Sequence, residues 1–372
     1  MPFPTDLLVF SPNDVDLSYS PLRSSIQAQT YVLGAFNPGL TRLPNGNLLL
    51  MIRVAEALNQ PIIGEQIHTI RWDQAGGYVL DAYPLNSVNA ADPRKFQLLG
   101  YPYKVMALTS LSWLLPVELT PDGTRVVSVH YDKIIAPQRT YQEYGVEDAR
   151  LSKIGDTYYM TTCSVSAERH STTLYTSTDG LNYTLRGIIL DHQNKDMVLF
   201  EGLIDGKFYA LTRPLGDLYF ATRPGSDSFP GPSINLSSSP DALHWKPVDE
   251  PFIRARKGSA STMKIGGGTP PILTEKGWLL LYHGVELNGV VGIYRTFWAL
   301  LDANDPTQLI QLHDTTPLME PNSALTEPIK DQLYLSGVVF TTGIVEAGDH
   351  YIVASGEADL ACRITHLPKS LF

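Results

Sequence analysis

A glycine turn that opens a short apolar strand recurs along the chain of 372 residues, and this repetition constrains the fold more than any other feature. From Gly155 onward the turn glycines are 51, 71 and 71 residues apart. Repeats of this size are typical of chains that build one small sheet per repeat. The five turns are Asn45-Gly46-Asn47, Ile154-Gly155-Asp156, Asp205-Gly206-Lys207, Lys276-Gly277-Trp278 and Ala347-Gly348-Asp349.

A second repeat supports the same interpretation. The segment from Ser177 to Tyr183 aligns with that from Ser239 to Trp245, each with an Asp placed to accept hydrogen bonds from the amides of a hairpin turn. Units of 50–70 residues with about four short strands each predict an all-β fold, a five-bladed β-propeller. A β-sandwich or β-helix is the alternative.

The chain shows no break in composition, so we expect one domain over residues 1–372. The interval from Gly46 to Gly155 is longer than the others, at 109 residues, and has room for two units. Within it, Ala90–Leu99 is the best candidate for a short helix, although Pro93 permits little helix before it.

Charge and composition exclude several classes of function. The chain has 28 Lys and Arg against 38 Asp and Glu, and a net charge of −10 argues against a nucleic-acid partner. Two cysteines are too few for a disulfide framework, and the nine histidines show no ligand spacing, so we expect no metal. With neither a signal peptide nor an apolar membrane span, a cytoplasmic protein without membrane contact is predicted. The oligomeric state stays open, a homo-oligomer included.

Basic residues occur at matching positions after the turn glycines. Arg53 and Arg213 each follow their glycine by seven residues, and His283 follows Gly277 by six. Equivalent strands of a propeller line one channel, so these side chains are predicted to converge into a cationic pocket. The alternative is that each one pairs privately with a nearby carboxylate.

The acid candidate lies in the segment Tyr144 to Arg150. Strand alternation places Asp148 and Arg150 on one face and Glu147 on the other, although Asp148 and Arg150 could simply form a structural ion pair. Two more polar clusters are Asn194-Lys195-Asp196 and the segment Lys264 to Pro271. The three glycines of the latter segment would let backbone approach a ligand closely.

Together these blocks resemble glycoside hydrolase family 130, the inverting β-mannoside phosphorylases and their mannosidase relatives. The likeness runs from about residue 30 to 360, and the family's fold is a five-bladed β-propeller. The matching blocks are Phe36-Asn37-Pro38-Gly39, Ile52-Arg53-Val54, Val146-Glu147-Asp148-Ala149-Arg150-Leu151, Asn194 to Pro214, Lys264 to Ile272 and Thr274 to Gly284.

The resemblance implies a role for each matching residue. Asp148 matches the general acid, and Arg150 matches the arginine that follows and orients it. The phosphate-binding set is matched by Arg53, Arg213, Lys264 and His283, and the contacts to the sugar in the −1 subsite by Asn37 and Asp359. The chain departs from the family where Ala149 replaces a usual Pro and where Glu201-Gly202-Leu203 replaces a common Pro-Glu-Lys, and it aligns poorly from Ala55 to Gly145. In the family the proton is thought to travel through the mannosyl 3-hydroxyl.

Inverting hydrolysis needs a carboxylate base opposite the acid, whereas phosphate is already an anionic nucleophile and needs only cations to hold it. We therefore expect phosphorolysis of a β-mannoside to α-mannose 1-phosphate, with inorganic phosphate as co-substrate and no cofactor. Two alternatives are a β-mannosidase with Glu201 or Glu56 as base and a non-catalytic propeller. The linkage, β-1,4 or β-1,2, and the acceptor stay open. Aromatic side chains that could stack on an acceptor sugar are Tyr101, Tyr103, Trp113 and Tyr219.

Overall fold

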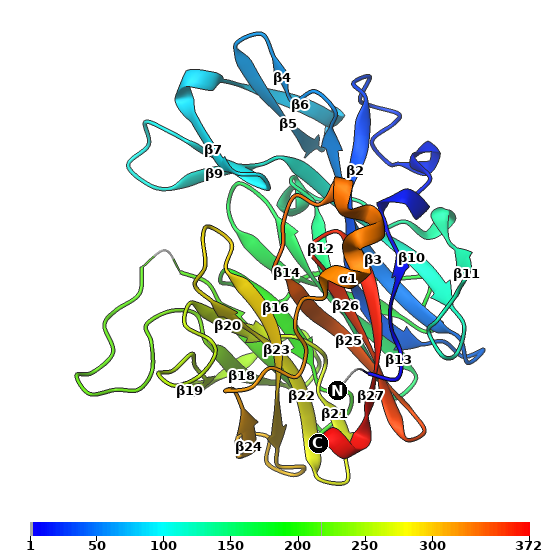
Figure 1. Ribbon diagram of the computed structural model, residues 1–372, viewed down its shortest axis with the longest axis vertical. Helices are drawn as coiled ribbons and strands as arrows, with labels where there is room; N and C mark the ends of the chain where they lie inside the picture. Colours follow the sequence, from blue (N-terminus) through cyan, green and yellow to red (C-terminus); the bar gives the residue numbers. More distant parts are fainter. Residues whose placement is uncertain (1–2, 217) are drawn as a thin grey trace.

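The computed structural model describes residues 3–216 and 218–372, which form mainly short β-strands (Figure 1). The all-β prediction is confirmed. In this part of the chain the only α-helix is the single turn α1 (Ser323–Thr326), and no helix has the length and apolarity to cross a membrane. The 3-10 turns are Pro12–Asp14, Leu17–Tyr19, Leu85–Ser87, Tyr131–Lys133, Thr140–Gln142, Glu327–Gln332 and Lys369–Leu371.

Among the described residues the strands form seven sheets, five of four or more strands and two of three. Each larger sheet is antiparallel. Their strands, in spatial order, are β2 (Thr30–Arg42), β3 (Leu48–Leu58), β10 (Ser110–Leu119) and β11 (Val126–Val129); β12 (Val146–Ile154), β13 (Thr157–Val165), β14 (His170–Ser177) and β15 (Thr184–Ile188); β16 (Asn194–Leu199), β17 (Phe208–Pro214), β18 (Ile234–Ser239) and β19 (Lys246–Ile253); β20 (Lys264–Gly267), β22 (Gly277–Glu286), β23 (Ile293–Leu301) and β24 (Leu309–His313), with β21 (Ile272–Thr274) beside β22; and β25 (Val339–Ala347), β26 (His350–Glu357), β27 (Ala361–Pro368) and β1 (Asp6–Phe10).

The repeated glycine turns all occupy the same place in these sheets. Each one precedes the second strand of a larger sheet, and all five glycines have positive φ, from 58° at Gly155 to 125° at Gly277. Glycine adopts this left-handed conformation without steric cost. The repeat read from the sequence is therefore the connection into the second strand of each sheet.

The long interval between Gly46 and Gly155 holds an insert, residues 59–109, instead of a second unit. It forms two three-stranded sheets, one of β4 (Ile62–Ile63), β5 (Gln66–Asp73) and β6 (Gly77–Pro84), the other of β7 (Val88–Asp92), β8 (Lys95–Leu98) and β9 (Val105–Leu108). Both project at the upper left of Figure 1. Strands β3 and β10 stay paired on either side of the insert, from Ala57 opposite Ser110 to Leu48 opposite Leu119.

The expected helix over Ala90–Leu99 is wrong. The segment is the hairpin β7–β8, and the Asp92 side chain accepts a hydrogen bond from the amide of Arg94 (3.0 Å), which stabilises a tight turn around Pro93. Phe96 is fully buried in a cluster with Ile67 and Ala107, so packing within the insert favours the strand.

The last larger sheet combines both ends of the described chain, because β1 pairs antiparallel with β27, Asp6 lying opposite Thr365. A buried ion-pair network reinforces this contact: Arg363 Nε lies 2.6 Å from Asp6 Oδ1, and Arg363 Nη1 lies 2.9 Å from Glu357 Oε2.

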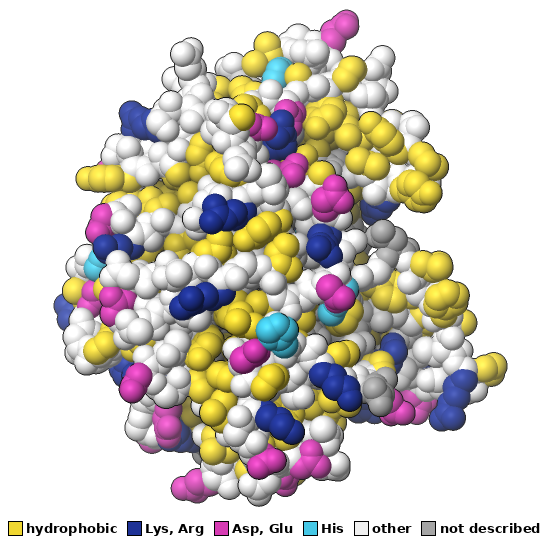
Figure 2. Space-filling view, turned by 180° about the vertical axis from the view of Figure 1, so that it is seen from behind, with side chains coloured by type: hydrophobic (Ala, Val, Ile, Leu, Met, Phe, Trp, Pro, Cys, Tyr) yellow, Lys and Arg dark blue, Asp and Glu magenta, His cyan; other side chains and the backbone are white. Residues whose placement is uncertain are grey.

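We call the strand that begins each larger sheet in the spatial order above its first strand: β2, β12, β16, β20 or β25. The first strands of neighbouring sheets lie side by side, and hydrogen bonds from side chains to backbone link them. Ser152 Oγ of β12 donates to the carbonyl of Leu199 in β16 (2.9 Å), and Thr342 Oγ1 of β25 donates to the carbonyl of Pro38 in β2 (2.8 Å). Apolar clusters fill the spaces between sheets, for example Leu48, Leu50 and Ile52 of β3. On the face seen in Figure 2, basic and acidic side chains intermingle.

Candidate active site

Three first strands are interrupted by a β-bulge that carries a polar residue in the left-handed conformation. These residues are Asn37 in β2 (φ 49°), Asp148 in β12 (φ 52°) and Asp196 in β16 (φ 59°). Asn and Asp tolerate this conformation better than other non-glycine residues, and a bulge redirects a side chain out of the strand's alternation. The same kind of bulge therefore turns three polar side chains out of the alternation of their strands.

The first of two groups of charges, which we call the Asp148 cluster, consists of Asn37, Arg53, Glu147, Asp148 and Lys195. Arg53 Nη1 lies 3.1 Å from Asp148 Oδ1 and Arg53 Nη2 lies 2.8 Å from Glu147 Oε1. Asn37 Nδ2 donates to Asp148 Oδ1 (2.9 Å), and Lys195 Nζ lies 3.0 Å from Glu147 Oε2. The bulge makes the expected alternation wrong, because Glu147 and Asp148 both face Arg53.

The charges around Asp148 determine its proton affinity. Burial raises the pKa of this carboxyl, but Arg53, Lys195 and Arg150 outweigh burial and hold the pKa below its ordinary value. The pKa of Glu147 is likewise lowered, because Arg53 and Lys195 together overcome its burial. Without substrate, both carboxylates are therefore ionised at neutral pH.

The second group, the Asp196 cluster, consists of Arg150, Asp196, Arg213, Lys264 and His283. Asp196 Oδ2 lies 2.9 Å from Arg213 Nη2 and 3.7 Å from His283 Nε2, and Asp196 Oδ1 lies 3.6 Å from Arg150 Nη2. Arg213 Nη1 lies 3.4 Å from His283 Nε2. Burial raises the pKa of Asp196, but these basic groups outweigh it and keep the pKa low.

Two members of the Asp196 cluster have strongly altered pKa values. Burial lowers the pKa of His283 to about 3, with Arg213 and Lys264 adding to the effect, so the imidazole is neutral at pH 7. Burial, Arg213 and Arg94 lower the pKa of Lys264 to about 7. Lys264 Nζ lies 4.9 Å from the centre of the Tyr294 ring. Of the four residues expected to bind phosphate, His283 is thus uncharged at neutral pH.

Arg150 links the two clusters from a fully buried position. Its Nη1 donates to the backbone carbonyl of Asp148 (3.0 Å) and its Nε donates to the carbonyl of Gly268 (2.8 Å). It forms no ion pair with the Asp148 carboxylate within salt-bridging distance, so the structural pair considered from the sequence is absent from the described contacts. This position is consistent with a residue that orients the acid.

The glycines of the segment Lys264 to Pro271 make room for neighbouring protein groups. A Cβ on Gly266 would lie 2.5 Å from His283 Cε1 and 2.7 Å from Asp196 Oδ2. A Cβ on Gly268 would lie 2.5 Å from the carbonyl oxygen of Leu281. Gly266 therefore leaves room for Asp196 and His283, while the expected approach of this backbone to a ligand stays a prediction.

Asp359 enters the site from the hairpin between β26 and β27. Ala358 (φ 58°) and Asp359 (φ 49°) form a two-residue turn closed by a hydrogen bond from the Leu360 amide to the carbonyl of Glu357 (3.0 Å). Tyr334 OH donates to the carbonyl of Asp359 (2.8 Å). Burial raises the pKa of Asp359, opposed by Arg94 and Arg53.

The structure brings all the expected site residues to one end of the sheets, but as two linked clusters and not as one cationic pocket. Arg213 and His283 meet at Asp196, whereas Arg53 lies in the Asp148 cluster, and both arginines pair with carboxylates as the alternative expected. Sequence reasoning did not assign Glu147, Lys195, Asp196 or Arg94 to the site. Lys195 and Asp196 had a signal, because they belong to the polar cluster Asn194-Lys195-Asp196 noted in the sequence, whereas Arg94 lies in the insert outside the repeat.

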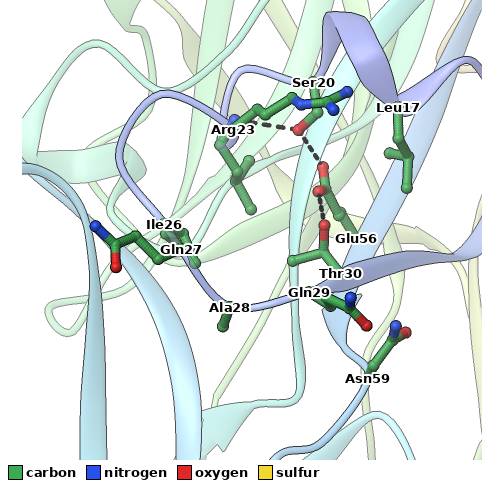
Figure 3. Close-up of a pocket in the computed structure, with 11 residues that line it drawn as sticks. Leu17, Ser20, Arg23, Ile26, Gln27, Ala28, Gln29, Thr30, Glu56 and Asn59 are labelled. Atoms are coloured by element: carbon green, nitrogen blue, oxygen red, sulfur yellow. Dashed lines mark hydrogen bonds between the residues drawn. The ribbon is translucent and has the colours of Figure 1, made fainter.

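Neither alternative base lies with the Asp148 carboxylate. Glu56 borders a separate cavity of about 370 Å³, where it accepts hydrogen bonds from Ser20 Oγ (2.6 Å), Thr30 Oγ1 (2.6 Å) and Trp113 Nε1 (3.0 Å) (Figure 3). Glu201 follows the far end of β16 and faces the amide of Lys153 (3.4 Å).

The aromatic candidates also divide. Trp113 is fully buried in the core and is excluded as a sugar platform, whereas Tyr101, Tyr103 and Tyr219 are exposed.

Over residues 3–216 and 218–372, no group of three or more His, Cys, Asp or Glu side chains is arranged to hold a metal ion.

Comparison with known proteins places this chain in a family. A family model described as beta-1,4-mannooligosaccharide phosphorylase matches residues 101–370. The chain therefore belongs to glycoside hydrolase family 130, and the resemblance noted in the sequence is confirmed.

Individual relatives refine this placement. A Listeria innocua protein named beta-1,2-mannobiose phosphorylase is 33% identical over 343 residues, covering 88% of this chain and 87% of its own. The structure of beta-1,2-mannobiose phosphorylase from Listeria innocua, in complex with beta-1,2-mannobiose, superimposes with a TM-score of 0.78 and 30% identity over 98% of this chain and 95% of the other. A Ruminococcus albus protein named beta-1,4-mannooligosaccharide phosphorylase is 30% identical over 162 residues, 43% of this chain and 44% of its own.

Proposed function

We propose that the protein is an inverting β-mannoside phosphorylase that acts on β-1,2-linked mannobiose or short β-1,2-mannosides. Phosphate attacks the anomeric carbon, the glycosidic C–O bond breaks, and a proton from Asp148 goes to the departing acceptor oxygen. The products are α-mannose 1-phosphate and the shortened acceptor. The choice of β-1,2 linkage is supported by relatives of that name, which match more of the chain than the β-1,4 relative does.

One observation carries this proposal: the acid lies beside several basic groups, and neither alternative base carboxylate lies opposite it. Arg53, Arg213 and Lys264 can bind a dianion, with His283 as a neutral hydrogen-bond donor or acceptor. The dianion would compete with Asp148 for Arg53. It would thereby raise the pKa of Asp148 and help the acid to hold its proton at the moment of bond cleavage.

For the architecture, we propose a single domain in which the five larger sheets are the five blades of a β-propeller. The count of larger sheets and the contacts between their first strands support this assignment. The charged clusters then lie at one mouth of the central channel, which is where propellers commonly bind ligands.

The test is to incubate the protein with β-1,2- and β-1,4-mannobiose, each with and without inorganic phosphate, and to quantify mannose 1-phosphate and free mannose. We expect mannose 1-phosphate from the β-1,2 disaccharide only when phosphate is present. Free mannose released at the same rate without phosphate would identify a β-mannosidase. No product from any disaccharide would favour a binding protein.

A further inference from the structure

The insert carries one charged side chain into the candidate site. Arg94 lies at the tip of the β7–β8 hairpin, and the Asp92 carboxylate binds one edge of its guanidinium, with Nε 3.0 Å from Oδ1 and Nη2 3.0 Å from Oδ2. Asp92 is itself buried, and it also accepts a hydrogen bond from the Arg94 amide (3.0 Å). A side chain held at this many points has a fixed orientation.

The remaining nitrogen of Arg94 faces the sugar-binding carboxylate expected from the sequence. Arg94 Nη1 lies 3.9 Å from Asp359 Oδ2, and within the described residues this is the only basic group at salt-bridging distance from that carboxylate. Arg53 approaches from the other side, but two of its nitrogens are taken by Glu147 and Asp148. Arg94 is still 31% exposed, so a ligand can reach the guanidinium.

We propose that Arg94 is a positioning residue that fixes the Asp359 carboxylate for sugar binding, and that the small sheet β7–β8–β9 forms one wall of the mannoside subsite. This inference rests on the proposed function, in which Asp359 accepts hydrogen bonds from mannosyl hydroxyls. At 3.9 Å Arg94 Nη1 attracts the ionised carboxylate without a hydrogen bond to it, so the carboxylate oxygens keep their lone pairs for the sugar. Phosphate, gripped by the Arg213 side of the site, does not depend on this contact.

A purely structural role for Arg94 makes a different prediction. If the pair only tethered the insert to the body of the protein, its loss would lower stability or affect both substrates equally. The insert contains a matched pair for comparison: Arg71 of β5 binds Asp81 of β6 through Nε (2.6 Å) and Nη2 (3.2 Å) and contacts none of the site residues named above.

The experiment compares Arg94→Ala, Arg94→Lys and Arg71→Ala in phosphorolysis assays in which mannoside and phosphate are varied separately. For Arg94→Ala, assayed near pH 6 where Lys264 is protonated with or without Arg94, we expect KM for the mannoside to rise about tenfold, with KM for phosphate changed by less than about twofold. Arg94→Lys should recover part of the mannoside affinity, because it restores the charge but not the forked geometry. Arg71→Ala should match the parent.

Equal increases in both KM values, an unchanged mannoside KM in Arg94→Ala, or the same effect from Arg71→Ala would overturn the proposal. If Arg94→Ala does not fold, as judged by its thermal unfolding, Arg94→Lys alone decides: a mannoside KM equal to that of the parent refutes the role. Failure of the proposed function looks different, because the parent enzyme itself would then release no mannose 1-phosphate.

Discussion

The Asp148 cluster and the Asp196 cluster share one backbone arrangement, but they differ in how far solvent reaches their aspartates. In both, a left-handed aspartate at a bulge of a first strand meets an arginine from a second strand, Arg53 in one case and Arg213 in the other. The Asp148 side chain is 10% exposed, whereas that of Asp196 is 2% exposed. A repeated backbone feature can thus supply a reactive carboxyl in one sheet and a buried counter-charge in the next.

The partners of the two aspartates follow the same division. Arg53, the partner of Asp148, is 16% exposed, so a substrate can take over its contact, whereas Arg213, Arg150 and His283 around Asp196 are only 8%, 1% and 0% exposed. Breaking a sealed ion pair leaves an uncompensated buried charge and costs stability, while a partly exposed pair is cheaper to rearrange. We therefore expect a substitution of Asp148 to affect chemistry more than folding, and a substitution of Asp196 to affect folding more than chemistry.

The largest expected effect is on turnover. Asp148→Asn keeps the side-chain volume but removes the transferable proton, and we expect kcat to fall by about 10²- to 10⁴-fold. Initial rates of mannose 1-phosphate formation measure this loss. Asp205→Asn is the matched control, because Asp205 has the same left-handed backbone (φ 49°) at an exposed turn. An Asp148→Asn protein as active as the parent would refute the acid assignment.

The second prediction concerns stability. Asp196→Asn removes the negative charge among Arg150, Arg213 and His283, and we expect the free energy of unfolding to fall by about 3–5 kcal/mol. Urea denaturation of both aspartate variants makes the comparison directly. If Asp148→Asn proved as destabilising as Asp196→Asn, the proposed division between the two clusters would be wrong.

The third prediction concerns phosphate affinity and pH. Lys264→Met should raise KM for phosphate by about tenfold near pH 6, where the ammonium is present. Because the pKa of Lys264 is lowered to about 7, its charge is lost in the free enzyme as the pH rises through that value, so the ratio of variant to parent KM should shrink toward pH 8.

Lys153→Met is the control for this measurement, because Lys153 also lies over a tyrosine ring, that of Tyr158 at 5.2 Å, but on the far half of β12. A ratio that stayed constant from about pH 6 to about pH 8 would contradict the titration of Lys264 in this range.

The smallest expected effect comes from a carboxyl that has no arginine partner. Burial raises the pKa of Glu201 to about 7, so the folded protein holds this proton more tightly than the unfolded chain does. Its stabilising contribution is complete below the ordinary pKa and is lost as the pH rises through 7. Since solvent still reaches part of the side chain, Glu201→Gln should raise Tm by only about 1–3 °C at pH 8, and by less at pH 5.

The exposed Glu275 provides the control, Glu275→Gln, which should leave Tm unchanged at both values. Scanning calorimetry at the two pH values measures the difference. A substantial loss of activity in Glu201→Gln would count against phosphorolysis, because it would return Glu201 to the role of a base in a hydrolase.

The sequence predicted the parts of the molecule that repeat. The turn glycines located the connections into the second strands, and counting from them brought Arg53, Arg213 and His283 to one end of the sheets. The all-β class and the family are confirmed, while the blade count, the cytoplasmic location and the individual residue roles stay predictions.

The features of the fold and site that the sequence did not predict depend on local geometry, which the repeat does not encode. The bulge at Asp148 turned Glu147 toward Arg53 against the expected alternation, and burial removed the charge of His283. The insert replaced an expected helix and an expected second unit, because its own small core around Phe96 decided its conformation. Arg94 lies in this insert, at a position unrelated to the repeat.

The uninterrupted pairing of β3 with β10 has a consequence for evolution and engineering. Since the two strands keep their register outside the insert, the intervening segment can lengthen, shorten or be exchanged at a small cost in loop-closure entropy. The insert is thus an exchangeable segment: under the two proposals above, its Arg94 contributes to the mannoside subsite while Asp148 and the phosphate-binding residues stay on the larger sheets. Swapping this segment between related enzymes would be a direct route to new sugar preferences.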